Sequence, residues 1–270
     1  MTADACTAQP ARSQSLLLAA ASGGAIGLLG GMIGLGGAEF RLPLLIGVFG
    51  FVALQAVILN KAMSLVVVTA ALPARLLGVS YDQVTAEWLV VVNLLVGSLV
   101  GAWAGATWAT RMASATLYRV LAVLLVLIAG VLLVTHLGDF APLALDGSAL
   151  FAAGVVAGAG IGVVAALMGV AGGELLIPTI VLLYAVDVKV AGSLSLAVSL
   201  PTMLVAFARY SRDQSFAILA ASKTFLVAMA LGSVLGTVAG GLLLGVVPEV
   251  VLVPLLAALL VISSVKVWQH

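Results

Sequence analysis

One ten-residue pattern interrupts this hydrophobic chain twice, first as Gly34-Leu35-Gly36-Gly37-Ala38-Glu39-Phe40-Arg41-Leu42-Pro43 and again as Gly169-Val170-Ala171-Gly172-Gly173-Glu174-Leu175-Leu176-Ile177-Pro178. Glu174 lies 135 positions after Glu39, which is half of the 270-residue chain. The prolines match at the same offset, and so do the glycines at 37 and 172. The match predicts a duplicated unit in which each half carries one broken hydrophobic segment.

The composition is that of a membrane protein. The chain is 64% hydrophobic and 8% charged, and its mean hydropathy is +1.32. Several spans of about 20 apolar residues would use this much apolar surface, whereas a water-soluble domain could not bury it. Runs such as 121–128 lack the alternation of a membrane β-barrel. The sequence therefore predicts an all-α polytopic membrane protein.

Charge and motifs exclude other classes of protein. The formal net charge of +1 offers no basic surface for nucleic acid. Cys6 is the single cysteine, which excludes an internal disulfide or a cysteine metal cluster. We find no nucleophile triad, phosphate-binding loop or dinucleotide fingerprint, so we expect neither an enzyme nor a bound cofactor. Residues 1–14 are interpreted as a retained N-terminal tail.

Each half is expected to contain a broken helical hairpin followed by three spanning helices, or about 8–10 membrane segments in all. The segment 40–51 would form a helix of roughly 18 Å, too short to cross a hydrocarbon core of roughly 30 Å. The domains are a first repeat at 15–137, a connecting loop at 138–147 and a second repeat at 148–270. The expected helices are 15–33, 40–51, 53–77, 87–109 and 115–137 in the first repeat, and 148–168, 175–186, 190–208, 215–245 and 249–267 in the second.

The offset of 135 holds in a second pair of motifs, two ladders of glycines spaced four residues apart. Their members are Gly97, Gly101 and Gly105 in the first half, and Gly232, Gly236 and Gly240 in the second. Small residues at this spacing allow close packing of membrane helices. The ladders are therefore expected to pack helices either within the fold or between two chains of a homodimer.

The loop charges favour inverted repeats with both chain termini in the cytoplasm. Lys and Arg concentrate in short cytoplasmic loops, and in the first half Arg111 and Arg119 flank the fourth loop while Asp82 and Glu87 lie in the third. The pattern reverses in the second half, where the third loop carries the basic residues. The basic residues of that third loop are Arg209, Arg212 and Lys223, and Glu249 lies in the fourth loop. Arg75, near the end of the helix 53–77, is the exception to this charge pattern.

Inverted repeats with broken helices are typical of secondary transporters. Irregular backbone within a membrane must face protein or a watery cavity, so the two glycine breaks are expected near a central site. Amides at helix N-termini hold anions, and Pro43 and Pro178 are expected in the first turns of the short helices. The amides assigned to the substrate are those of Gly36, Gly37, Gly172 and Gly173.

Glu39 and Glu174 are the candidates for proton coupling. An acid inside a membrane is costly and therefore functional by default. The alternative interpretation is that the acids only stabilise helix N-termini. Arg41 is interpreted as the counter-charge of the substrate, as a partner of Glu39, or as a side chain that reaches the interface. Leu176 occupies its place in the second half.

Polar residues in the helices 53–77 and 190–208 complete the candidate site. A spacing of four places Asn60 with Ser64 on one helix face, and Ser195 with Ser199 on another. Such faces either line a pathway or join helices. The substrate-binding candidates on these helices are Asn60, Lys61, Ser64, Ser195, Ser199 and Thr202.

The sequence resembles the TauE/SafE family, also called the sulfite exporter or TSUP family, over residues 15–267. The resemblance lies in the paired glycine-glutamate-proline motifs, the Asn60-Lys61 pair and the stretch 191–196. It implies a carrier of sulfur-containing or other small organic anions in the bacterial cytoplasmic membrane, driven by the proton gradient. The acids at 39 and 174 and Arg41 depart from the commoner family pattern. Two acids would repel an anion unless protonated, which fits proton coupling or a substrate other than sulfite.

These observations predict a proton-coupled secondary transporter that moves a small anion, such as sulfite or an organosulfonate, by alternating access. Its partners would be the anion, protons and membrane lipids. Two alternatives stay open: a cation or metal carrier that uses Glu39 and Glu174 as ligands, and a passive anion channel.

Overall fold

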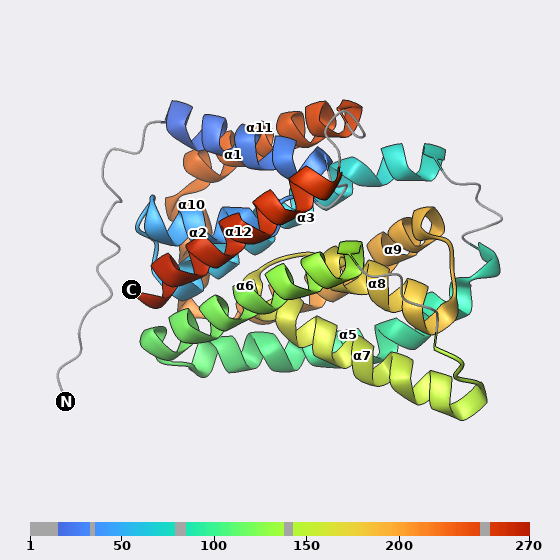
Figure 1. The fold of residues 1–270 in the computed structure, drawn as a ribbon. Helices are drawn as coiled ribbons and strands as arrows, with labels where there is room; N and C mark the ends of the chain where they lie inside the picture. Colours follow the sequence, from blue (N-terminus) through green and yellow to red (C-terminus); the bar gives the residue numbers. More distant parts are fainter. Residues whose placement is uncertain (1–15, 33–35, 79–84, 138–142, 244–248) are drawn as a thin grey trace.

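The described part of the chain is helical and contains no strand (Figure 1). The computed structural model describes residues 16–32, 36–78, 85–137, 143–243 and 249–270. The side chains of 71–78, 136–137 and 249–250 lie outside this description, and Arg75 is one of them. The helices are α1 (Leu16–Met32), α2 (Ala38–Gly47), α3 (Ala53–Gly78), α5 (Trp88–Arg111), α6 (Ser114–Leu137), α7 (Gly147–Met168), α8 (Gly173–Tyr184), α9 (Val188–Tyr210), η1 (Gln214–Ala217), α10 (Ile218–Ala221), α11 (Lys223–Leu242) and α12 (Glu249–Trp268).

Seven of the described helices are long and apolar enough to cross a membrane, namely α3, α5, α6, α7, α9, α11 and α12. The helices α1 and α8 are apolar but have 17 and 12 residues, and α2 has ten. The prediction of an all-helical membrane protein with half-length helices is thereby confirmed.

The helices of the two halves begin at matching positions. α2, α3, α5 and α6 begin at residues 38, 53, 88 and 114, and α8, α9, α11 and α12 begin at 173, 188, 223 and 249. The two starts in every pair are separated by 135 residues, so the repeat seen in the sequence is also a repeat of helix positions.

The expected boundaries of the short helices were wrong. α2 starts two residues before the expected helix and ends four residues before it, and α8 starts at Gly173. Pro43 and Pro178 are consequently the sixth residues of their helices and not first-turn residues. The cause is that Gly37 and Gly172, both left-handed, end the break and allow the helix to begin at once.

The element expected at about 215–245, which included the entry to its helix, is not continuous. It divides into η1, α10 and α11. The Asp213 carboxylate accepts a hydrogen bond from the Ser215 N–H at 2.9 Å and starts a separate 3-10 turn. A local side-chain cap of this kind competes with the continuous helix that hydropathy indicates.

The glycine ladders join the two halves within one chain. α1 packs along α11, and α5 packs along α7 (Figure 1). A β-carbon added at Gly97 would meet the carbonyl of Val155, and one added at Gly232 would meet that of Ala20, 135 residues earlier. The first helix of each half therefore lies against the ladder of the other half. A homodimer stays a prediction, and it would use other surfaces than these.

Several contacts bring helix ends together at one side of the bundle. Arg209 Nε near the end of α9 donates to Thr107 Oγ1 near the end of α5, at 2.8 Å. The Ala53 N–H at the start of α3 donates to the Tyr118 hydroxyl near the start of α6, at 3.2 Å. The rings of Tyr118 and His270 lie 5.9 Å apart, which adds the end of α12 to this group. α3 thus begins where its sequence counterpart α9 ends.

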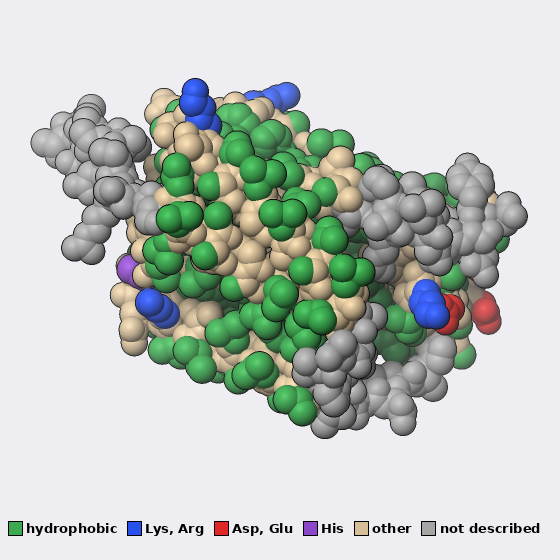
Figure 2. Space-filling model, turned by 90° about the horizontal axis from the view of Figure 1, so that it is seen from above, with side chains coloured by type: hydrophobic (Ala, Val, Ile, Leu, Met, Phe, Trp, Pro, Cys, Tyr) green, Lys and Arg blue, Asp and Glu red, His purple; other side chains and the backbone are tan. Residues whose placement is uncertain are grey.

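We call this side the basic end, and it is defined by the side chains of Arg111, Arg119, Arg209, Arg212, Lys223 and Lys266. The opposite ends carry Glu87, Asp146, Asp187 and Lys189. Figure 2 shows Lys and Arg at the left and along the top of one face, Asp and Glu near its right edge with a further basic side chain beside them, and hydrophobic side chains between. Asp213 also lies at the basic end, beside Arg212. The inverted repeat and the orientation in a membrane stay predictions.

Candidate functional site

The two glycine breaks turn the chain directly into the short helices. In the first break Gly36 and Gly37 have φ of 80° and 70°, and in the second Gly169 and Gly172 have φ of 71° and 83°. Only glycine adopts this left-handed region without strain. Gly173, in contrast, is the first residue of α8. The amides of α2 and α8 that have no partner within their own helices therefore lie directly after each break.

Glu39 and Glu174 occupy the second position of α2 and α8, and they meet. Their exposed fractions are 1% and 9%, and their carboxyl groups face each other and interact directly. Apart from this contact between the two acids, no other residue in the described part of the chain donates a hydrogen bond to either oxygen of Glu39 or to Oε2 of Glu174. Each acid also lies in a first helical turn, where the helix dipole favours negative charge.

The guanidinium of Arg41 is completely buried and bonded to three neutral side chains. Nε donates to Asn60 Oδ1 at 3.1 Å, Nη1 to Ser233 Oγ at 3.3 Å and Nη2 to Ser64 Oγ at 3.3 Å. Its partners lie on α3 and α11, so Arg41 joins three helices. It does not reach the membrane interface, and Glu39 acts on it only by longer-range attraction.

Three predicted residues of α3 bind the end of α7 and the second break. Lys61 Nζ donates to the carbonyl oxygens of Ala165 and Val170, each at 2.7 Å. The last carbonyls of a helix have no partner within the helix, and this ammonium supplies one. Asn60 Nδ2 donates to the carbonyls of Ala38 and Met168 at 3.0 Å, and Ser64 Oγ donates to that of Gly169 at 3.2 Å.

The matching residues of α9 make no such set of bonds. Leu196 stands at the position that corresponds to Lys61, and Ser195 Oγ donates to the Gly192 carbonyl of its own helix at 2.8 Å. Ser199 Oγ is buried without a hydrogen-bond partner in the described residues. The buried hydroxyl of Thr202 bonds Ser98 Oγ at 2.8 Å and joins α9 to α5.

The structure therefore brings part of the predicted set together. The residues that gather between the halves are Glu39, Arg41, Asn60, Lys61, Ser64 and Glu174. Sequence reasoning missed Ser233 as a ligand of Arg41. Its signal was present, because Ser233 and Ser98 match at the offset of 135 and both lie within a glycine ladder.

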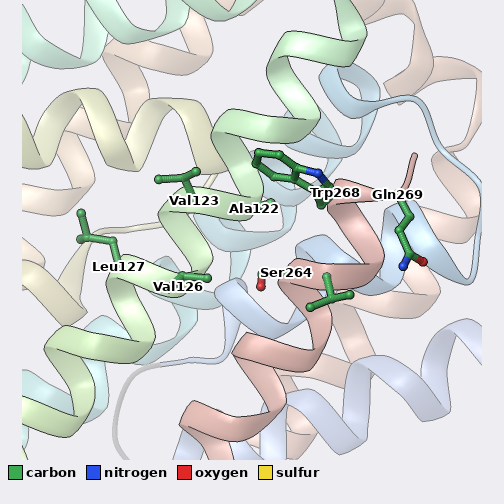
Figure 3. Close-up of a pocket in the computed structure, with 8 residues that line it drawn as sticks. Ala122, Val123, Val126, Leu127, Ser264, Trp268 and Gln269 are labelled. Atoms are coloured by element: carbon green, nitrogen blue, oxygen red, sulfur yellow. The ribbon is translucent and has the colours of Figure 1, made fainter.

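Two hollows of the structure lie away from this cluster. One, of about 490 Å³, runs between α6 and α12 and is lined by Val123, Val126, Leu127, Ser264, Trp268 and Gln269, among others (Figure 3). The other, of about 690 Å³, lies at the basic end beside Gln55, Thr110 and Arg212. Neither includes a predicted site residue, so the carboxyl pair opens into neither of them.

Comparison with protein-family models decides the class of the protein. The model of the family described as sulfite exporter TauE/SafE matches residues 19–267. The chain belongs to this family. Comparison with curated proteins found no match, and comparison with solved structures found none.

TauE/SafE proteins are membrane transporters, and this chain is accordingly a multi-pass membrane transporter and not an enzyme. The family match extends from α1 to α12 and includes both breaks and the whole buried cluster. The resemblance recognised in the sequence is thus confirmed. The roles of the individual site residues stay predictions.

Proposed function

We propose that this TauE/SafE protein is a proton-coupled secondary transporter of a small anion, either sulfite or an organosulfonate or another sulfur-containing anion, in the bacterial cytoplasmic membrane. The observation that carries the proposal is the meeting of Glu39 and Glu174 between the halves, beside two buried cations. Movement of one half against the other would expose this centre to each side in turn.

Anion binding is supported by the chemistry around the carboxyl pair. Arg41 and Lys61 have exposed fractions of 0%, and all their hydrogen bonds go to neutral groups. Buried cations without an acid bonded to them attract an anion strongly, because the surroundings screen charge poorly. The free amides at the starts of α2 and α8 add further donors for an oxyanion. Asn60, Ser64, Ser195 and Ser199 are proposed as polar contacts, and they become available as the halves separate.

Proton coupling is supported by the surroundings of the acids. A buried carboxylate without hydrogen-bond donors is costly in its charged form. A proton on the pair avoids this cost while the pair is buried. Once one side of the protein opens, water solvates the pair and the charged form is no longer costly. Glu39 and Glu174 are therefore proposed to take up and release protons as the access changes.

The charge distribution supports a cytoplasmic basic end. Short cytoplasmic loops carry an excess of Lys and Arg, and six of the described basic side chains define that end. α12 also ends there, and α1 begins beside the start of α11. We therefore propose that both chain termini are cytoplasmic.

A cation carrier is the second candidate, and one observation favours it. Pro43 and Pro178 have no N–H for the carbonyls of Glu39 and Glu174 four residues earlier. Each short helix therefore offers a free backbone oxygen near an unpartnered carboxyl group, and hard cations prefer such oxygen ligands. A passive anion channel would share the anion site but would show flux that is independent of the pH gradient.

The first experiment is a thermal-shift titration of the purified protein at about pH 5.5 and 7.5. Its panel contains sulfite, thiosulfate, taurine-like sulfonates, small carboxylates, sodium and divalent cations. A ligand of the folded state raises the unfolding temperature. Stabilisation by a sulfur oxyanion, stronger at the lower pH, supports the proposal. Stabilisation by a cation at the higher pH, absent in Glu39→Gln, would replace it by the cation carrier.

A further inference from the structure

The buried charges of the protein form a small and countable set. Among the described residues the buried ionisable acids and bases are Glu39, Arg41, Lys61 and Glu174. With both acids ionised and both bases positively charged, this set has no net charge. With one proton on the pair of acids its net charge is +1, and a second proton would raise it to +2.

The geometry of the two carboxyl groups favours the state with one proton. They interact with each other, and no other residue in the described part of the chain donates a hydrogen bond to the oxygens of Glu39 or to Oε2 of Glu174. Two adjacent carboxylates repel each other, so they do not both ionise readily in a buried site. A single proton between them forms a charge-assisted O–H···O⁻ hydrogen bond, which is stronger than a neutral one. The two groups therefore titrate as one pair.

The elements packed around the pair contribute few other titratable groups. α2 lies against α1, α3 and α12, and α8 lies against α6, α7 and α9. Besides the two buried cations these helices carry three tyrosines with engaged hydroxyls. Tyr118 accepts from the Ala53 N–H, Tyr184 accepts from Asn93, and Tyr210 donates to the Ala166 carbonyl. Among the side chains that the structure describes, the charged residues on these helices and their flanks lie at helix ends, and they are Arg119, Lys189, Arg209, Arg212, Lys266, Asp146, Asp187 and Asp213.

The two cations have fixed positions. Each polar nitrogen of the Arg41 guanidinium has a neutral partner, and Lys61 is held by two main-chain oxygens. These hydrogen bonds keep both side chains in the centre when the proton leaves. The centre with one proton has a net charge of +1, which balances one monovalent anion. The centre without the proton has no net charge and balances none.

We propose that Glu39 and Glu174 act as one carboxyl pair that binds a single proton together with each monovalent anion, so that one proton and one anion cross together without net charge. The inference rests on the proposed transport function and assigns to it a substrate class, a stoichiometry and a direction of coupling. The proton bound from one side is released to the other, and the anion leaves with it because the net attraction has disappeared.

The test measures the affinity for methanesulfonate, which is a monovalent anion throughout the range, between about pH 5.5 and 8. Binding of one proton with each anion weakens the apparent affinity about tenfold for each pH unit above the titration of the pair. Sulfate, a divalent anion at the same pH values, should bind more weakly than methanesulfonate. An affinity for methanesulfonate that does not change with pH would overturn the shared proton. Absence of binding by every anion tested would instead overturn the proposed function.

Glu174→Gln is the decisive variant. It leaves Glu39 beside Arg41 with no second carboxyl group, so the net charge of the centre stays at +1. Methanesulfonate should still bind, with an affinity that varies less than about threefold over the range in which the wild type changes about tenfold per pH unit. The matched control, Asp187→Asn, removes an exposed acid at a helix end and should retain the wild-type slope. Retention of that slope in Glu174→Gln would overturn the pair.

Reconstituted protein tests the electrical prediction. Methanesulfonate uptake driven by a pH gradient should be unchanged when a potassium diffusion potential is imposed with valinomycin, since no net charge moves. Acceleration or inhibition of uptake by the potential would overturn the ratio of one to one. The double variant Glu39→Gln/Glu174→Gln, folded as judged by size exclusion, should show no proton-driven uptake.

Discussion

Lys61 Nζ lies 2.7 Å from the carbonyl oxygen of Val170, so a side chain of the first half closes the backbone break of the second. The same ammonium binds Ala165, within the last turn of α7. A positive charge at a helix C-terminus also complements the helix dipole. Lys61 is thus a structural link between the halves as well as a charge in the centre.

Lys61→Met should destabilise the protein by about 1–3 kcal/mol. Two buried carbonyls lose their donor, and each unsatisfied group costs about that much, although the desolvation cost of the ammonium also disappears. The matched control is Leu196→Met, at the equivalent place in α9, which should change stability by less than about 1.5 kcal/mol. Thermal unfolding in detergent measures both, and equal midpoints would contradict the role of Lys61 as a cap.

Arg41→Leu gives the first half the residue that the second half carries at position 176. A buried charge with neutral partners adds little net stability, so we expect a folded protein. The affinity for a small anion should nevertheless fall at least about tenfold, because one positive charge leaves a poorly screened site. Arg41→Lys retains the charge and is the control. Wild-type affinity in Arg41→Leu would show that Arg41 only joins α2, α3 and α11.

Much of the fold could be predicted because membrane helices and their breaks depend on local composition. The expected helices 53–77 and 148–168 differ from α3 and α7 by one residue at most at each end. The position of Pro43 and the division after Asp213 could not be predicted in this way. Both depend on where one glycine or one carboxylate side chain starts a turn, and hydropathy contains no information about this choice.

The sequence could predict which residues form the site but not the contacts that these residues make. Asn60 and Lys61 are conspicuous because polar side chains are rare in this chain, yet three of their four main-chain acceptors are more than 100 residues away. Every residue has a backbone carbonyl, so the sequence does not indicate which of them accepts a side-chain hydrogen bond. The repeat suggested that Glu39 and Glu174 meet. The consequence of having Lys61 in one half and Leu196 in the other is visible only in the structure, where Lys61 binds two carbonyl oxygens of the second half.

Glu39→Gln and Glu174→Gln should each abolish proton-driven transport while the protein stays folded. Glutamine preserves the shape of the side chain, and its amide can donate a hydrogen bond to the remaining carboxyl group. Uptake into proteoliposomes with an imposed pH gradient measures the effect, and the unfolding temperature serves as the control for folding. Full activity in both variants would contradict any coupling role and leave the acids as helix-terminal residues.

Gly101→Ala should destabilise the protein by at least about 1–3 kcal/mol, because the new methyl group would meet the carbonyl of Ala159 and force α5 away from α7. Gly160→Ala places the same methyl group one residue further along α7, where no atom lies within 4 Å. That change should be neutral or stabilise the helix by up to about 1 kcal/mol. Equal unfolding temperatures for the two variants would contradict the packing role of the ladder.

Labelling of single cysteines should place the basic end in the cytoplasm. The single native cysteine is removed by Cys6→Ser, and a new one is introduced by Arg212→Cys at the basic end or by Asp187→Cys at the opposite end, both at exposed positions. Because basic residues concentrate in cytoplasmic loops, a membrane-impermeant maleimide should label Asp187→Cys in cells with a permeabilised outer membrane and an intact inner membrane. Arg212→Cys should react only after the inner membrane is opened. The reverse labelling pattern would show that the whole bundle has the opposite orientation. The result applies to the whole bundle because α3, α6 and α12 lie at the same end as Arg212, through Gln55, Tyr118 and His270.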